Sequence, residues 1–203
     1  MSRPREAPAP ATGMREKKKA RTREAIVQAA LELFEKKGFD ATTVEEIAAA
    51  ADISTRTLFR YFTSKEDVIF LGQDEENARA VEMLRTRPEG EAPLDTLFRG
   101  TRILLDTSRD TLKHAQRGLA IVQRTPALRA RRQQVLNEIQ DIIATGLAGK
   151  RATKTEALRM RLLAAAYLAA LNEAMVAWIT SGAKGDPSAQ IDLVEDLLRN
   201  GFR

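Results

Sequence analysis

Cysteine is absent from this 203-residue chain, and histidine occurs only once, as His114. Without cysteine the chain can form no disulfide, no thiol nucleophile and no thiolate metal site. One histidine cannot build a histidine cluster for zinc or iron, and the Glu-x-x-His spacing of carboxylate metal bundles does not occur. The composition therefore predicts a protein that has no metal, no cofactor and no enzyme activity.

Long apolar runs are also lacking. The longest, residues 162–171, is far shorter than the roughly 20 residues that a membrane span needs. The residues that follow Met1 include proline, arginine and glutamate rather than the apolar centre of a signal peptide. We therefore expect a cytoplasmic protein with no membrane partner.

The residues that are present predict an all-α fold of about nine helices. Hydrophobic residues make up 43% of the chain, which is enough for a core, and no segment alternates as a strand would. The fourth predicted helix begins after Ser64 and has room for a break near Gly72. The nine predicted helices cover residues 21–37, 44–51, 55–61, 65–87, 93–108, 110–124, 126–147, 154–181 and 187–199.

Positive charge is concentrated at the N-terminus. Residues 1–23 contain eight Lys or Arg and two Glu, a net charge of +6, whereas the whole chain has a net charge of +5. Pro4, Pro8 and Pro10 favour an extended or disordered arm over residues 1–20. Such an arm can follow DNA phosphates or enter a minor groove. The alternative is a tail that only improves solubility.

Residues 42–54 predict a short capped helix and a tight turn. Val44, Ile47, Ala48 and Ala51 recur on one helical face. Thr43 and Glu46 have the spacing of a capping box, so we expect the helix to begin at Val44. The next three residues, Asp-Ile-Ser, form the turn, and Asp52 tolerates the left-handed conformation that such a turn can need.

The following helix, residues 55–61, carries a polar and basic face. Ser54 caps it, and Leu58 and Phe62 turn toward the core. No carboxylate occurs from Thr55 to Phe62. Arginine can bridge guanine acceptors or grip phosphate, and threonine and tyrosine hydroxyls bind phosphate oxygens. The pattern is typical of a helix-turn-helix with its second helix in the DNA major groove. The alternative is a short packed helix that has a basic face by chance.

Residues 23–67 resemble the DNA-binding domain of the TetR family of bacterial transcription regulators. Three positions depart from the family pattern: Asp52 stands in place of a turn glycine, Arg56 in place of a small residue, and Phe59 in place of a tyrosine that often touches phosphate. The residues that carry the resemblance are Ile26, Ala29, Ala30, Leu33, Phe34, Gly38, Phe39, Thr42, Thr43, Val44, Ile47, Ala48, Ala51, Ile53, Ser54, Thr57, Leu58, Tyr61, Phe62, Ser64, Lys65 and Glu66.

The resemblance implies a DNA-binding domain at residues 21–66 and a helical effector-binding and dimerisation domain at residues 67–203. It also implies double-stranded DNA as a partner, with a palindromic operator. The side chains that we expect at the DNA are Thr42, Thr43, Ser54, Thr55, Arg56, Thr57, Phe59, Arg60, Tyr61 and Lys65.

The last two predicted helices have more apolar surface than one small bundle can cover. From Lys154 to Ser181 the helix is apolar nearly all round between residues 162 and 179. From Pro187 to Arg199 a stripe of Ile191, Val194, Leu197 and Leu198 lies on one face. A second copy of the chain is the expected cover, and the resemblance agrees, because TetR-like proteins generally dimerise through their last two helices. The alternative is that the two helices only pack the core of one chain.

Few residues could read a small molecule. A pocket is mostly apolar and has a few polar anchors. Each of the candidates could equally be a core, dimer or surface residue, and the sequence does not identify the effector. The predicted ligand residues are His114, Tyr167, Glu173, Met175 and Trp178, with Asn172, Met83, Leu104 and Met160 as further possible lining.

The leading hypothesis is a homodimeric transcription regulator, in the form of a repressor that a small-molecule effector releases from DNA. An architectural or division-associated DNA-binding protein on the same fold is the alternative. Neighbouring genes and the number of genomic sites would separate the two.

Overall fold

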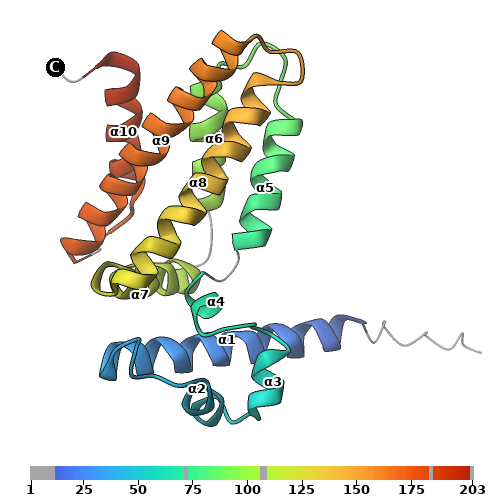
Figure 1. Cartoon of the computed structure of the whole chain (residues 1–203), viewed down its shortest axis with the longest axis vertical. Coiled ribbons are helices and arrows are strands. Elements are labelled where there is room, and N and C mark those ends of the chain that lie inside the picture. The colour runs from blue at the N-terminus through green and yellow to red at the C-terminus, as the bar shows by residue number, and fades with distance from the viewer. Residues whose placement is uncertain (1–11, 71–72, 106–108, 183–184, 202–203) are drawn as a thin grey trace, which may run out of the picture. The chain divides into compact units, whose positions relative to one another are not determined.

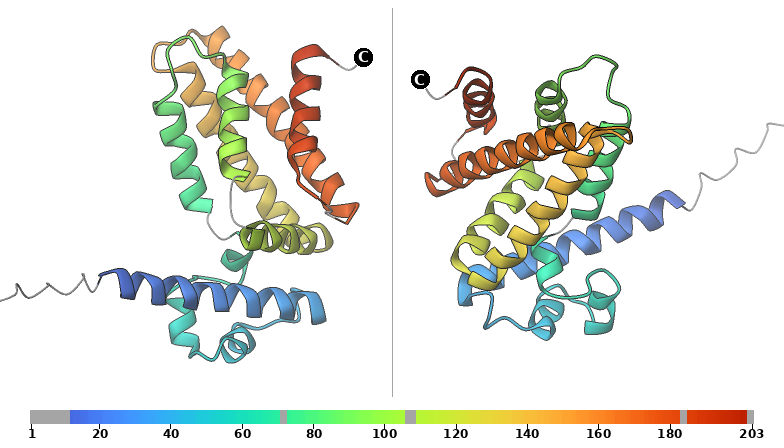
Figure 2. Two further views of the ribbon diagram at one scale, coloured as in Figure 1. Left: turned by 180° about the vertical axis from the view of Figure 1, so that it is seen from behind. Right: turned by 45° about the horizontal axis from the view of Figure 1, so that its top comes forward.

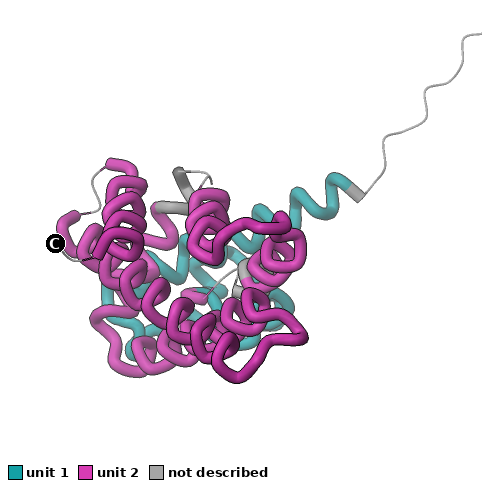
Figure 3. The backbone as a smooth tube through the Cα atoms, turned by 90° about the horizontal axis from the view of Figure 1, so that it is seen from above, with its two compact units in different colours: residues 1–68 teal, residues 69–203 magenta. Residues whose placement is uncertain are grey.

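The computed structural model describes residues 12–70, 73–105, 109–182 and 185–201, with residues 12, 73–76 and 109–112 described by their backbone alone. Within these ranges the chain forms ten α-helices and no strand (Figure 1), which confirms the all-α prediction. The chain divides into two compact units, residues 1–68 and residues 69–203 (Figure 3).

The first unit is built on one long helix. Ile26, Ala30 and Phe34 form the predicted buried stripe of α1, and Gly38, with φ of 88°, follows the last helical residue. The helices of this unit are α1 (Thr12–Lys37), α2 (Val44–Ala50), α3 (Thr55–Phe59) and the short α4 (Glu66–Ile69), which continues by one residue into the second unit.

The helix α1 begins earlier than predicted. It starts at Thr12 rather than Arg21, so residues 12–20 are helical and not extended. Arginine, lysine, glutamate and alanine dominate this stretch, and all are good helix formers. The last arm proline is Pro10. The rest of the predicted arm, residues 1–11, lies outside the described residues.

The second unit contains six helices, and the views in Figure 2 show α8 and α9 side by side. The predicted helix after Ser64 is two helices in the structure, α4 and α5, which is why ten helices are found rather than nine. The six helices are α5 (Gln73–Arg85), α6 (Pro93–Leu105), α7 (Arg109–Arg124), α8 (Pro126–Ala148), α9 (Lys154–Thr180) and α10 (Ser188–Asn200).

The core of the second unit lies between α6, α8, α9 and α10. The rings of Phe98 and Tyr167 meet edge to face, with centroids 5.4 Å apart. Ile191 and Val194 of α10 belong to this core, with 1% and 3% of their surface exposed. The expectation that these two residues lie between two chains is therefore wrong, because the α10 stripe packs inside its own chain.

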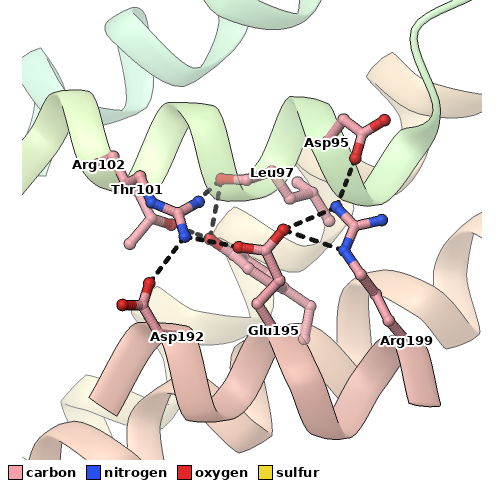
Figure 4. Close-up of polar contacts among 8 residues, drawn as sticks. Asp95, Leu97, Thr101, Arg102, Asp192, Glu195 and Arg199 are labelled. Carbon is pink, nitrogen blue, oxygen red and sulfur yellow. Dashed lines mark hydrogen bonds and ion pairs between the residues drawn. The ribbon is translucent and has the colours of Figure 1, made fainter. Parts of the chain in front are cut away.

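A network of charged side chains joins α6 to α10 at the surface (Figure 4). Arg102 Nη2 lies 2.9 Å from Asp192 Oδ1 and 2.6 Å from Glu195 Oε2. Arg199 pairs with the other oxygen of Glu195 at 2.8 Å and also with Asp95. Glu195 thus bridges two arginines, one from each helix.

One face of α9 and α10 is apolar and exposed. Leu158, Leu162 and Leu193 have 56%, 61% and 57% of their surface exposed. The helix α9 is long and apolar enough, by length and composition alone, to cross a membrane, and 17% of its most apolar stretch is buried within the chain. The core helix of a soluble protein meets the same criterion, so the finding identifies an uncovered apolar surface and no more.

Candidate nucleic-acid interface

Local hydrogen bonds fix the start of α3. Ser54 Oγ accepts from the Thr57 backbone N–H at 3.1 Å and lies 2.9 Å from Thr57 Oγ1. Leu58 and Phe62, with 0% and 4% exposure, anchor the inner face as predicted. Arg56, Phe59 and Arg60 lie on the exposed face. The helix is shorter than predicted, because it ends at Phe59 and turns follow over Arg60 and Tyr61.

The turn before α3 has the predicted left-handed residue. Asp52 has φ of 54°, in the region that glycine adopts most easily, and it is the one non-glycine residue with positive φ in the described part of the chain. Aspartate is one of the few other residues that enter this region readily. The Ile53 backbone N–H donates to the Ala48 carbonyl at 3.0 Å, which closes the turn between α2 and α3.

The helix α2 has the capping box that the sequence predicts. The Thr43 hydroxyl accepts from the Glu46 N–H at 3.2 Å, and a Glu46 carboxylate oxygen accepts from the Thr43 N–H at 2.8 Å. Lys37 pairs with the same carboxylate. The hydrogen bond from Lys37, followed by the one from the Thr43 backbone, lowers the pKa of Glu46. Thr43 and Ser54 therefore position the helix-turn-helix through their caps.

Tyr61 stands at the centre of a polar cluster that local sequence patterns do not predict. A hydrogen bond with the Thr22 side chain, helped by Arg60 and the positive charge of Lys19, lowers the pKa of the Tyr61 phenol. The Arg60 guanidinium lies 5.4 Å from the Tyr61 ring centroid. Lys19 and Thr22 come from α1, far from α3 in sequence, so only the fold could add them to the candidate interface.

Two predicted DNA-binding residues have structural positions instead. The Thr42 side chain is 1% exposed, and its hydroxyl donates to the Gly38 carbonyl at 2.8 Å. Lys65 Nζ donates to the carbonyls of Phe39 at 2.9 Å and Thr42 at 3.0 Å. It also lies 4.4 Å from the centroid of the Phe39 ring. The expectation that both residues meet DNA is therefore corrected: Lys65 fastens the loop between α1 and α2.

The predicted ligand residues do not form one pocket. Tyr167 and Trp178 are each 4% exposed, whereas Glu173 is exposed and His114 and Met175 are half-buried. The Tyr167 hydroxyl is used inside the core, where it donates to the Leu97 carbonyl at 3.2 Å and pairs with Thr101. Burial raises the pKa of this phenol.

Two surface pockets in the second unit involve other residues. One, of 530 Å³, lies between α5 and α8, and the other, of 600 Å³, lies between α6 and α10. Neither contains a predicted ligand residue. The first is lined by Val81, Leu84, Arg85, Asp141, Ile142, Thr145 and Gly146, and the second by Asp95, Phe98, Arg99, Arg102, Ile103 and Glu195.

The fold and the exposed basic face of α3 define an all-α helix-turn-helix protein. The chain belongs to the TetR family of bacterial regulatory proteins. The family model "Bacterial regulatory proteins, tetR family" matches residues 26–70, and the model "MftR C-terminal domain" matches residues 91–203.

Relatives and solved structures agree with this assignment. The chain is 34% identical over 144 residues to the HTH-type transcriptional regulator TcmR of Streptomyces glaucescens, a match that covers 68% of this chain. The chain spans 64% of the length of TcmR, less than two thirds. The fatty acid degradation regulator FadR of Bacillus halodurans is 28% identical, with a TM-score of 0.56 and coverage of 90% and 96% of the two chains. FadR of Thermus thermophilus, a repressor solved in complex with lauroyl-CoA, is 26% identical, with a TM-score of 0.50 and coverage of 89% and 95%.

Proposed function

We propose that this TetR-family protein is a sequence-specific DNA-binding transcription regulator, and specifically a repressor that a small-molecule effector releases from its operator. The observation that carries the proposal is the outer face of α3, where Arg56 and Arg60 are exposed on a capped helix with a buried anchor. The family and its named relatives support a regulator rather than an enzyme.

The side chains of the outer face divide into two roles. Arg56 lies on α3 itself, where a helix in the major groove meets base edges, so we assign it base contacts. Arg60 and Tyr61 follow the helix and meet Lys19 and Thr22 of α1. This cluster of two cations and two hydroxyls suits a phosphate of the DNA backbone. Thr55, Thr57 and Phe59 complete the proposed surface.

A second copy of the chain is the proposed cover for the exposed apolar face of α9 and α10. Leu158, Leu162 and Leu193 lie on helices whose other faces pack in the core. Exposed apolar patches of this kind mark association surfaces. Two copies related by a two-fold axis can present two α3 helices about one DNA turn apart, at ~34–36 Å, to a palindromic operator.

Oligomeric state tests the dimer. Sedimentation of the wild type should give a mass of twice 22.5 kDa. A double substitution, Leu162→Asp and Leu193→Asp, should give folded monomers, since both side chains are exposed in the single chain. The matched control is Leu104→Asp, which adds one charge at an exposed leucine on α6. A wild type that stays monomeric at micromolar concentration would rule out this interface.

The proposed effector is a small, mostly apolar molecule. An effector that fits better in a dimer with differently spaced α3 helices weakens operator binding by shifting the population between the two forms. Lauroyl-CoA is a reasonable first probe, because the T. thermophilus FadR relative was solved with it. Trp178 is the only tryptophan of the chain, so its fluorescence reports binding in the second unit. A general architectural role would instead appear as many unrelated genomic sites and no release by any effector.

Selection from a random duplex library tests the regulator assignment even though the operator sequence is unknown. The wild type should enrich an inverted repeat with half-sites one turn apart. The double variant Arg56→Ala/Arg60→Ala should lose this enrichment, whereas Lys150→Ala/Arg151→Ala, with the same charge change at the α8–α9 turn, should keep it. Enrichment of the same motif by the α3 variant would refute the proposed role of α3.

A further inference from the structure

The second unit has a long stretch with positive charge only. Residues 113–137 contain no aspartate and no glutamate. A solvated helix face normally mixes the two signs, because opposite charges three or four residues apart stabilise a helix and like charges destabilise it. This stretch lacks that compensation. Its six cationic residues are Lys113, Arg117, Arg124, Arg129, Arg131 and Arg132.

The arginines elsewhere in the unit provide a contrast. Arg85, Arg99 and Arg161 each pair with a carboxylate, at 2.7, 2.9 and 2.7 Å respectively. Arg102 and Arg199 share Glu195 (Figure 4). In all five cases the pairing offsets the positive charge within the fold.

Where α7 meets α8, arginines bond to neutral oxygens instead. Arg129 donates to the Gln123 carbonyl at 3.1 Å, and Arg131 donates to the Gln134 amide oxygen at 3.4 Å. These contacts orient the guanidinium groups and leave their charge uncompensated. Arg124, the last residue of α7, and both of these arginines are exposed. We call these three residues, Arg124, Arg129 and Arg131, the α7–α8 corner.

The cations of α7 extend the corner along one side of that helix. Lys113, Arg117 and Arg124 are spaced four and seven residues apart, which places them on one helical stripe. At 1.5 Å per residue the stripe is about 16 Å long. Leu119, Ile121 and Val122 of the same helix are buried, so the charged stripe is the part of α7 that meets solvent.

These surroundings favour a duplex backbone over other polyanions. A membrane-surface helix needs an exposed apolar face beside its cations, and the large apolar residues of α7 between residues 113 and 124 are buried. A single strand is held by aromatic side chains on which bases stack, and residues 113–137 contain no Phe, Trp or Tyr. Duplex DNA needs only cations that meet its phosphates.

We propose that the α7–α8 corner, continued by the α7 stripe, is a second DNA-binding surface that contacts the duplex backbone without regard to sequence. The proposal rests on the proposed function only in taking DNA as the partner. It concerns the second unit alone and needs neither an operator nor α3. Its effect is to raise affinity for bulk DNA and to hold the protein near DNA during the search for its operator.

The test is the salt dependence of binding to a fluorescent 40-base-pair duplex of random sequence, followed by anisotropy between 25 and 200 mM KCl. The variant Arg124→Ala/Arg129→Ala/Arg131→Ala removes the corner. The control Lys150→Ala/Arg151→Ala/Lys154→Ala removes three exposed cations at the other end of α8, so the net charge is the same in both. A third variant replaces the three corner arginines by lysine and keeps the charge.

We expect the corner variant to flatten the plot of log affinity against log salt by about 1 to 3, since each lost phosphate contact removes about 0.9. At the lowest salt its affinity should fall about tenfold or more relative to the control. The lysine variant should bind like the wild type. Equal slopes for the corner and control variants would overturn the proposal, as would a corner variant that loses binding only to vesicles of anionic phospholipid. Circular dichroism checks the fold of each variant; if the alanine variant is unfolded, a glutamine triple replaces it.

The two proposals fail in different ways. A failed regulator assignment appears as the absence of an enriched motif in the library selection, whereas the corner is judged on a duplex without any motif. Arg56→Ala/Arg60→Ala should leave the slope difference between the corner and control variants unchanged.

Discussion

Arginines on α3 and arginines between α6 and α10 carry the same group in opposite circumstances. Arg56 and Arg60 are exposed on a helix without any carboxylate. Arg102 and Arg199 are held by Asp95, Asp192 and Glu195 in a closed network. The comparison shows that the partner of an arginine, rather than its presence, separates a residue that stabilises the fold from one that is free to bind an external anion. Substitutions that affect stability in one region and binding in the other test this distinction.

The largest loss of stability should follow from Arg102→Ala/Arg199→Ala. Glu195 would keep neither of its cations, and its side chain is only 21% exposed. Burial opposes ionisation of Glu195, and the hydrogen bonds from Arg102 and Arg199 outweigh burial, so the net pKa is lowered. Because the two arginine side chains are 48% and 35% exposed, solvent screening limits the cost to about 1–2 kcal/mol of unfolding free energy. Urea denaturation measures it, and Lys150→Ala/Arg151→Ala is the control.

Lys65→Ala should cost about 1 kcal/mol of stability in the first unit, because it removes hydrogen bonds to the loop carbonyls and a cation–π contact with Phe39. Urea denaturation measures the cost, and Lys36→Ala, an exposed lysine near the end of the same α1 helix, is the control. The slope of DNA affinity against salt should stay unchanged. A flatter slope with unchanged stability would restore the phosphate contact that the sequence suggested.

The smallest effect should come from Glu91→Gln, and it should depend on pH. Hydrogen bonds from Arg99 and then Thr96 lower the pKa of Glu91 to about 2 from 4.5. A carboxylate with a lowered pKa adds stability above pH 4.5, and that contribution is lost as the pH falls from 4.5 toward 2. The variant should therefore be less stable than the wild type at neutral pH, and the difference should shrink below pH 4.5. A difference that does not vary between about pH 7 and pH 3 would contradict the pairing. Thermal unfolding at several pH values measures it.

Local signals explain the part of the site that the sequence predicts correctly. The Thr43–Glu46 capping box, the left-handed Asp52 and the Ser54 cap each involve residues within a few positions of one another. Backbone geometry and short-range hydrogen bonds determine them, so the pattern of residue types is enough. The position of α3 follows from these signals.

Contacts between distant segments explain the errors. Lys65 meets carbonyls more than 20 residues earlier in the chain, and Thr22 meets Tyr61 across the same unit. Apolar periodicity shows that Val194 is buried, but it does not show whether its own chain or a second copy buries it. Tyr167 is likewise an apolar-helix residue whose hydroxyl is already used by the core.

The most direct test of the central claim measures stability and operator affinity on the same two variants, using the operator found by selection. Arg56→Ala/Arg60→Ala should leave the unfolding free energy within about 0.5 kcal/mol of the wild type. Operator binding should weaken by about 1–3 kcal/mol for each arginine. Arg102→Ala/Arg199→Ala should show the opposite pattern in the folded protein, with lower stability and operator affinity close to that of the wild type. An α3 variant that binds the operator as tightly as the wild type would contradict the account.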